Sequence, residues 1–273
     1  MALQLNVDQI LANKSPKWHK RLPKFVIRLL ERIIHQDEMN AFLREHGEEK
    51  GVTFARSLIQ HLNIQLDIQH PENIPADGRP IIVSNHPLGG LDGIGYIALL
   101  SKYRQDMKFP VNDLLMNVEP LNNIFVPINK HGRQNTDAVK AFNKAFESDD
   151  LIFYFPAGLC SRRQQGVIKD LDWKGTVISK ARQYERDIIP VYFEGRNSNF
   201  FYNLANFRKK IGIKFNIEMI LLPDEMFKQR GQTFKITFGK PITYKTFTND
   251  RTNTEWANWL REETYKLANC RKG

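Results

Sequence analysis

A histidine and an aspartate, His86 and Asp92, lie six positions apart in the glycine-containing segment from Ser84 to Gly93. The apolar run 81–83 precedes this segment and predicts a buried strand, and catalytic groups gather where the strands of α/β sheets end. Glycine permits tight turns, so the segment can bring the two side chains together. Asp92 would then hold one imidazole nitrogen while the other takes a proton from an alcohol. An alcohol activated in this way can attack a thioester directly, without a covalent enzyme intermediate.

The same residues also have a simpler interpretation. His86 can be an ordinary loop residue, and Asp92 can be the N-cap of the helix that the apolar stretch 94–100 predicts. Residue types and spacing alone leave both interpretations open.

Other catalytic arrangements have less support in the sequence. There is no Gly-x-Ser-x-Gly elbow for a serine hydrolase and no glycine-rich loop of the Walker or dinucleotide-binding type. The two cysteines, Cys160 and Cys270, lie far apart and form no Cys-x-x-Cys or Cys/His cluster, which argues against a zinc site. A nucleophilic Cys160 is weakly supported because no second histidine is near it in sequence. We therefore expect neither a metal nor a cofactor.

The elements that would position His86 alternate between strands and helices, which predicts an α/β fold. We expect strands at 81–83, 125–128, 151–155, 188–193, 217–222 and 234–238, and helices at 16–35, 37–46, 51–62, 94–100, 136–147, 176–183 and 255–266. Residues 1–64 are predicted to form an N-terminal helical subdomain, and residues 65–273 the α/β domain.

The predicted helix over 16–35 is amphipathic. One face is apolar and the other carries Arg21, Lys24, Arg28 and Arg32, a pattern typical of a helix at a membrane surface. The alternative is an ordinary helix that covers the core with its basic face in solvent. The chain has no stretch of about 18 apolar residues and no secretory signal pattern, so we expect it to lie on a membrane rather than cross it.

The formal net charge of +10 favours an anionic partner, either nucleic acid, an acidic membrane surface or a phosphorylated substrate. Much of this charge lies in the segment 208–240, which follows the aromatic residues Phe200, Phe201, Tyr202 and Phe207. This region can contact acidic lipid, nucleic acid or the acidic surface of another protein; the alternative is a solvated rim of the sheet.

Four segments, in order, resemble the motifs of the glycerolipid acyltransferase family of the 1-acylglycerol-3-phosphate acyltransferase type. They are Asn85-His86 with Asp92, the run 123–130 (NIFVPINK), the run 155–162 (FPAGLCSR) and the run 188–191 (IIPV). The similarity extends over roughly residues 65 to 245. It implies a mixed central sheet flanked by helices, in addition to the N-terminal amphipathic helical subdomain, and an O-acyltransferase with His86 and Asp92 as the catalytic pair.

The resemblance also implies the substrates and their contacts. An acyl carrier protein or coenzyme A thioester would donate the acyl group to a lyso-lipid hydroxyl, at the cytoplasmic face of the inner membrane, with the enzyme bound peripherally and no nucleic acid involved. The anionic headgroup of the acceptor would be bound by residues within or just after the second and third motifs: Lys130, Arg133, Gly158, Ser161 and Arg162.

This chain departs from the family pattern in the first and third motifs. Five residues rather than four separate His86 from Asp92. In the third motif, Ala157 replaces the usual glutamate, and Leu159 and Cys160 stand at the threonine and arginine positions. These features resemble a divergent bacterial branch labelled hemolysin-like, some of whose members are thought to complete aminoacyl lipids. Lysophosphatidate and a monoacylated aminolipid both stay open as acceptors. The alternative to an enzyme is a catalytically degenerate basic protein that binds anionic lipid or nucleic acid.

Overall fold

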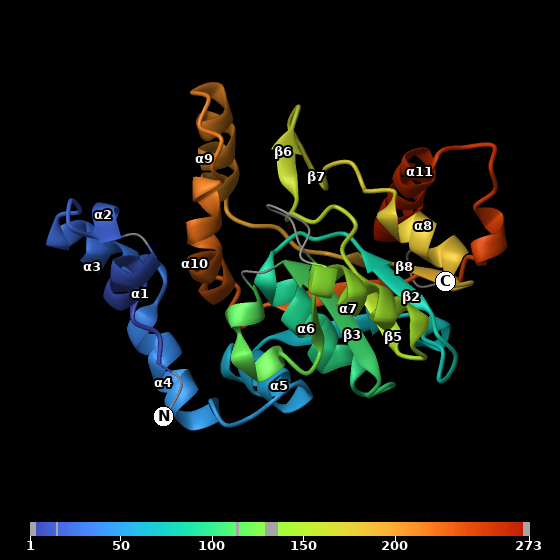
Figure 1. Ribbon diagram of the computed structural model, residues 1–273, viewed down its shortest axis with the longest axis horizontal. Helices are drawn as coiled ribbons and strands as arrows, with labels where there is room; N and C mark the ends of the chain where they lie inside the picture. Colours follow the sequence, from blue (N-terminus) through green and yellow to red (C-terminus); the bar gives the residue numbers. More distant parts are fainter. Residues whose placement is uncertain (1–3, 15, 113–114, 129–135, 270–273) are drawn as a thin grey trace.

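A seven-stranded mixed sheet forms the centre of the protein in the computed structural model, which describes residues 4–14, 16–112, 115–128 and 136–269 (Figure 1). Its strand order is β1-β9-β8-β2-β5-β3-β4. The strands are β1 (Gln65–Gln69), β2 (Ile81–Ser84), β3 (Met107–Asn112), β4 (Phe125–Ile128), β5 (Leu151–Tyr154), β8 (Ile188–Phe193) and β9 (Thr233–Phe238). Neighbouring strands are parallel except β8 and β9, which are antiparallel. The predicted α/β class with a mixed sheet is confirmed.

The central strands are buried on both faces, which explains their continuous apolar sequences. All four residues of β2 are buried, and successive side chains enter different cores. Ile82 belongs to the core on one face of the sheet, whereas Ile81 and Val83 belong to the core on the other. The two-residue period of a strand therefore divides a single apolar run between two hydrophobic layers.

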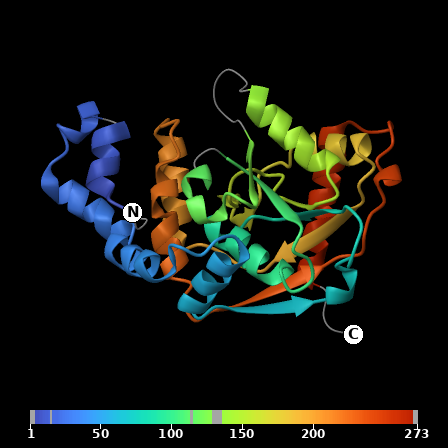
Figure 2. The ribbon, with the colours of Figure 1, turned by 60° about the horizontal axis from the view of Figure 1, so that its bottom comes forward.

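Helices cover both faces of the sheet (Figure 2). On one side lie α5 (Val52–His61) and α6 (Gly90–Leu100), which pack against each other. On the other side lie α7 (Thr136–Glu147), α8 (Thr176–Gln183) and α11 (Asn253–Lys266). A capping box between Thr252 and Glu255 fixes the start of α11. These helices match the predicted ones to within a few residues.

Over residues 4–14 and 16–46, the structure describes four short helices: α1 (Val7–Lys14), α2 (Pro16–His19), α3 (Lys24–Ile33) and α4 (Gln36–His46). The prediction of one continuous helix over 16–35 is therefore wrong. Pro23 is the N-cap of α3, and its ring prevents the helical hydrogen bonding that would continue α2 into α3. Ile27 is the buried residue of α3, whereas Phe25 and Leu29 are exposed. Within the described ranges, no helix is long and apolar enough to cross a membrane.

The predicted strand at 217–222 is also wrong. This segment forms the 3-10 helix η4 (Ile217–Leu221), followed directly by α10 (Leu222–Phe227). Glu218 lies in the first turn of η4 and is fully buried in ion pairs with Arg162 and Arg208. Elements that the sequence did not indicate are β1, β3, the hairpin of β6 (Arg162–Gln164) and β7 (Val167–Lys169), and helix α9 (Asn199–Lys210).

Candidate active site

His86 and Asp92 form a hydrogen-bonded pair at the carboxyl end of β2. The imidazole Nδ1 of His86 lies 3.1 Å from Oδ2 and 3.0 Å from Oδ1 of Asp92. Asp92 is fully buried in the first turn of α6, and its oxygens also accept hydrogen bonds from the backbone N–H groups of Leu88 and Gly93. The partly positive start of a helix favours a carboxylate there. The arrangement leaves Nε2 of His86 available to a ligand, and no residue in the described part of the chain bonds to it.

The glycines of the loop accommodate the five residues between His86 and Asp92. Gly89 has a φ of 80°, in the region that residues with a side chain avoid, and it is the N-cap of α6. A Cβ atom at this position would lie 2.9 Å from the Leu222 side chain of α10. The positive φ favours glycine, the contact with the Leu222 methyl groups adds a smaller penalty, and the turn lets Asp92 face back toward His86.

Asn85 fixes the loop to the neighbouring strand. Its side-chain amide donates to the carbonyl oxygen of Phe193 at 2.9 Å, and its Oδ1 accepts from the backbone N–H of Phe193 at 2.7 Å. Phe193 ends β8, which runs parallel to β2. Asn85 thus extends the hydrogen bonding between β2 and β8 by one residue. It fixes the backbone immediately before His86.

A buried carboxylate, Asp170, holds His86 from the opposite side. Its Oδ1 accepts hydrogen bonds from the backbone N–H of His86 at 3.2 Å and from the Ser161 hydroxyl at 2.6 Å, and its Oδ2 accepts from the Trp173 indole at 2.9 Å. Burial raises the pKa of Asp170, and the hydrogen bonds from Ser161 and Trp173 oppose that rise. The backbone N–H of Ser161 also donates to the His86 carbonyl at 2.8 Å.

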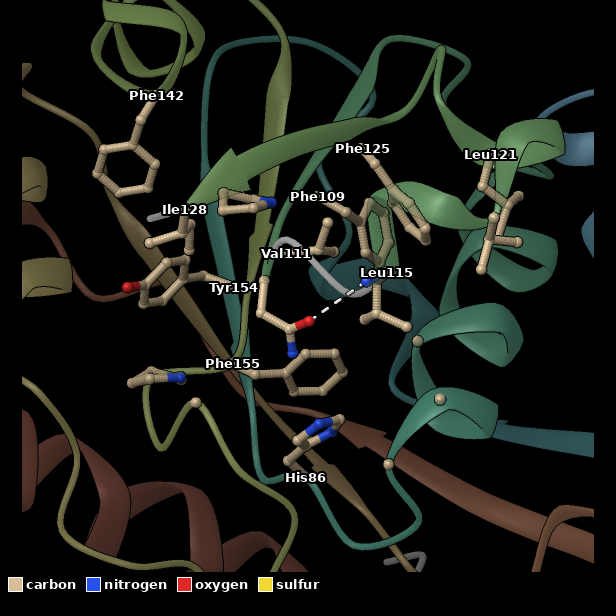
Figure 3. A pocket seen from close by; sticks show the side chains of 18 of the residues that line it. His86, Phe109, Val111, Leu115, Leu121, Phe125, Ile128, Phe142, Tyr154 and Phe155 are labelled. Carbon is tan, nitrogen blue, oxygen red and sulfur yellow. Dashed lines mark hydrogen bonds between the residues drawn. The ribbon is translucent and has the colours of Figure 1, made fainter. Parts of the chain in front are cut away.

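An apolar cavity of about 380 Å³ opens beside His86 (Figure 3). This volume lies within the range of small-molecule sites, roughly 300–1,000 Å³. The His86 ring stacks on Phe155, with their centroids 4.0 Å apart. Most of the remaining wall is apolar: Phe109, Val111, Leu115, Leu121, Phe125, Ile128, Phe142 and Tyr154 line it. The cavity therefore suits an extended hydrocarbon group whose reactive end lies at the imidazole.

The structure separates the predicted headgroup ligands. Gly158 lines the cavity, but Ser161 and Arg162 are buried outside it. Ser161 bonds to Asp170, and Arg162 forms an ion pair with Glu218 at 3.0 Å, so both hold the protein together and do not face the cavity. Lys130 and Arg133 lie outside the described residues.

Cys160 is unsuited to act as a nucleophile. Its side chain is buried beside Phe201 and Tyr202, and burial raises the pKa of its thiol. A thiol in these surroundings stays protonated, and the thiolate is the reactive form.

Sequence reasoning missed two residues of the site. Asp170 is far from His86 in sequence and belongs to no motif that we recognised there. Lys174 lines the cavity, and in the described part of the chain its ammonium group has no ion pair or hydrogen bond. An aspartate and a lysine four positions apart around Trp173 were the only signal, and such a pattern is common in solvent-exposed segments.

Comparison with known proteins identifies a matching family model and several similar proteins. A family model described as Acyltransferase matches residues 9–272. A lyso-glycine lipid O-acyltransferase of Bacteroides thetaiotaomicron is 51% identical over 265 residues, which cover 96% of this chain and 97% of that protein. A protein of Phocaeicola vulgatus with the same description is 47% identical over 264 residues, which cover 96% and 95%. The crystal structure of a 1-acyl-sn-glycerophosphate acyltransferase from Thermotoga maritima aligns with 92% of this chain and 99% of that one, with a TM-score of 0.48 and 14% identity.

Proposed function

The chain belongs to the acyltransferase family, and from this premise we propose that it transfers a fatty acyl group from a thioester to the hydroxyl of a lyso-glycine lipid, with His86 as general base. The observation that carries the proposal is the pairing of His86 Nδ1 with the buried Asp92 beside an apolar cavity. The two similar bacterial proteins supply the acceptor, since both are lyso-glycine lipid O-acyltransferases.

The proposed reaction follows from the geometry of the pair. Asp92 accepts the Nδ1–H of His86, so the neutral ring presents the Nε2 lone pair to the acceptor hydroxyl. As the hydroxyl oxygen attacks the thioester carbonyl, Nε2 takes its proton and the ring becomes an imidazolium that Asp92 stabilises. The carbon–sulfur bond then breaks, the ester forms, and the departing thiolate receives the proton. The base is regenerated and no acyl-enzyme forms.

The cavity gives the acyl chain a place during this step. Phe109, Val111 and Leu115 of the wall are apolar, so a hydrocarbon chain gains by leaving water, at roughly 25 cal/mol for each Å² of apolar surface that is buried. Stacking on Phe155 keeps the His86 ring at the end of this cavity. The chain would therefore enter the cavity with its thioester carbonyl beside Nε2.

Among the cations in the described part of the chain, we assign Lys174 to binding of the acceptor headgroup. It lines the same cavity as His86, and glycine lipids end in a carboxylate that an ammonium group can bind. Lys130 and Arg133 keep their predicted headgroup role as part of the proposal, as does Gly158 on the cavity wall.

We also propose the acyl donor and the membrane location of the reaction. The donor would be an acyl carrier protein or coenzyme A thioester, and the enzyme would work peripherally at the cytoplasmic face of the inner membrane. Residues 1–64 would form the membrane-surface part and residues 65–273 the part that performs the transfer. Exposed Phe25 and Leu29 on α3, with Arg28 between them, support a lipid contact by the first of these parts.

The direct test is acyl transfer by the purified protein. Labelled acyl carrier protein and acyl-coenzyme A would each be offered with lyso-glycine lipid, monoacylated ornithine lipid and lysophosphatidate, to the wild type and His86→Ala. We expect a diacylated glycine lipid from the wild type and none from the variant. A preference for another acceptor would correct the substrate, and the absence of every product from folded protein would favour a binding protein of the same family.

A further inference from the structure

Helix α9 carries an apolar stripe that faces solvent. Phe200, Phe207 and Ile211 recur at the three- and four-residue spacing of a helix face together with partly buried Leu204, and 62%, 58% and 52% of their respective surfaces are exposed. The segment after the helix adds Ile213 and Phe215, of which Phe215 is 71% exposed. A contiguous exposed apolar patch marks an interaction site, in contrast to scattered single residues.

The opposite face of α9 is already occupied by the core. Phe201, Tyr202 and Ala205 are fully buried, and Arg208 is held by Glu218. The exposed stripe is therefore a second apolar face, which the fold of the described chain leaves uncovered. Figures 1 and 2 both place α9 between the N-terminal helices and the sheet.

The charges on the same segment define the chemistry of the partner. Lys209, Lys210 and Lys214 are exposed, and the segment from Asn199 to Asn216 contains no acidic residue. Lysines beside exposed phenylalanines suit a surface that offers both hydrocarbon and negative charge, which is the boundary of an anionic bilayer. The cations complement anionic headgroups while the phenylalanine rings enter the acyl region.

The start of α9 is attached to the loop that carries His86. The amide of Asn197 donates to the carbonyl oxygen of Pro87 at 3.2 Å, and Gly195 packs closely on Leu88. Ser198 caps α9. These contacts would link a bilayer bound to α9 to the loop that carries His86.

We propose that residues Phe200, Phe207, Ile211, Ile213 and Phe215, with Lys209, Lys210 and Lys214, form a surface that binds an anionic lipid bilayer. We call it the α9 surface. It is distinct from the apolar pair on α3, and it deepens the proposed function because it places the membrane that holds the acceptor beside the His86 loop.

Vesicle co-sedimentation tests the surface without any substrate. The wild type and the double variant Phe207→Ser/Phe215→Ser would be mixed with phosphatidylcholine vesicles that contain or lack phosphatidylglycerol. Loss of two phenylalanine rings that would enter the bilayer should weaken binding by at least about tenfold. The triple variant Lys209→Gln/Lys210→Gln/Lys214→Gln should lose the preference for phosphatidylglycerol, on the order of a hundredfold if each lysine contributes about 1 kcal/mol.

Tyr103→Ser is the matched control, because Tyr103 is an exposed aromatic residue on another element, in the turn after α6. It should bind vesicles as the wild type does. All variants should keep the wild-type thermal unfolding temperature, since the changed side chains lie in solvent. The double variant should also keep activity on detergent-dispersed acceptor while losing it on acceptor in vesicles.

Three outcomes separate the possibilities. Vesicle binding by the double variant equal to that of the wild type would overturn the proposal. If the wild type formed a dimer that the double variant does not form, while vesicle binding stayed unaltered, the stripe would instead bind a second copy of the chain. Reduced vesicle binding would support the α9 surface even if lyso-glycine lipid proved not to be the acceptor, because this measurement contains no acceptor.

Discussion

The backbone N–H of His86 donates a hydrogen bond to the side chain of Asp170, which lies 84 positions further along the chain. Asp170 is buried and belongs to the segment that follows β7. Its other hydrogen bonds come from Ser161 and Trp173, and its own backbone N–H donates to the Tyr265 hydroxyl of α11. The position of the proposed base thus depends on the hairpin segment and the last helix as well as on β2.

Asp170→Asn should impair the enzyme without removing any group that touches substrate. The new amide would place an N–H donor toward either the Trp173 indole N–H or the donors of His86 and Ser161, and an unsatisfied buried donor costs about 1–3 kcal/mol. We expect a lower free energy of unfolding and a lower kcat, with little change in KM. Denaturant unfolding and steady-state kinetics measure the two effects.

The double variant Asp170→Asn/Trp173→Phe distinguishes this hydrogen-bond explanation from general damage. Removing the indole donor relieves the conflict, so the double variant should be less destabilised than the sum of the two single changes. Simple additivity would argue that Trp173 and Asp170 act independently.

Lys174→Gln should weaken recognition of the acceptor carboxylate. Loss of a charge-assisted contact worth about 1.5–3 kcal/mol corresponds to a rise in KM of about tenfold or more. An acceptor whose carboxylate is converted to a neutral amide should show no such difference between wild type and variant. Lys180→Gln is the control, because Lys180 lies on α8 and bonds to Gln183 outside the cavity. Equal effects of Lys174→Gln on both acceptors would rule out headgroup recognition.

Gly89→Ala should reduce both stability and activity. The φ of 80° and the approach of Leu222 each penalise a Cβ atom, and an unfavourable backbone region alone costs about 1–3 kcal/mol. Gly166→Ala provides the comparison, since Gly166 has a φ of 84° in the β6–β7 hairpin but has open space around it. Activity and thermal unfolding of both variants check this. Full activity in Gly89→Ala would show that the loop turn tolerates a side chain.

The Arg104–Asp106 pair should make stability depend on acid pH. The hydrogen bond from Arg104 is the main cause of the lowered pKa of Asp106. A carboxylate whose pKa is lower in the folded state stabilises the fold above its ordinary pKa, about 3.9, and this contribution is lost as the pH falls through the lowered value.

Asp106→Asn should therefore be less stable than wild type at neutral pH, and the difference should shrink below about pH 4. Urea unfolding at a series of pH values measures this. A difference that is constant with pH would show that the charge of Asp106 contributes nothing.

The sequence was most informative where one signal dominated. The buried run Ile81–Val83 has strand residues, a short length and turn chemistry on both sides, and the strand is present. The periodicity of residues 136–147 predicted a helix, and α7 has those bounds. The proximity of His86 and Asp92 was also predictable, because glycines and a strand end leave few ways to arrange so short a loop.

The errors arise where tertiary contacts decide the structure. Residues 217–222 are apolar enough for a strand, but Glu218 forms buried ion pairs with Arg162 and Arg208. Pro223 lies in the first turn of the following helix, α10. Arg162 was predicted to bind the headgroup, but it forms one of these ion pairs with Glu218. Charge patterns in sequence do not reveal which cation meets a buried anion.

Contacts between residues that are far apart in the sequence could not be predicted, for a similar reason. Asp170 contacts His86 only because β2 and the segment after β7 meet in space, and no local pattern encodes that meeting. Helix α9 was missed because it is apolar on two faces, so the three- and four-residue period of an amphipathic helix is obscured.

A double-mutant cycle of single-turnover rates measures whether His86 and Asp92 act as one unit in acyl transfer. His86→Gln should lower the rate by about 10²–10⁴-fold, as expected for loss of a general base, and Asp92→Asn should also lower it. If the pair acts as a unit, the double variant should be no slower than His86→Gln alone. A wild-type rate in His86→Gln would show that His86 is not the general base. A loss in the double variant equal to the product of the two single losses would show that His86 and Asp92 act independently.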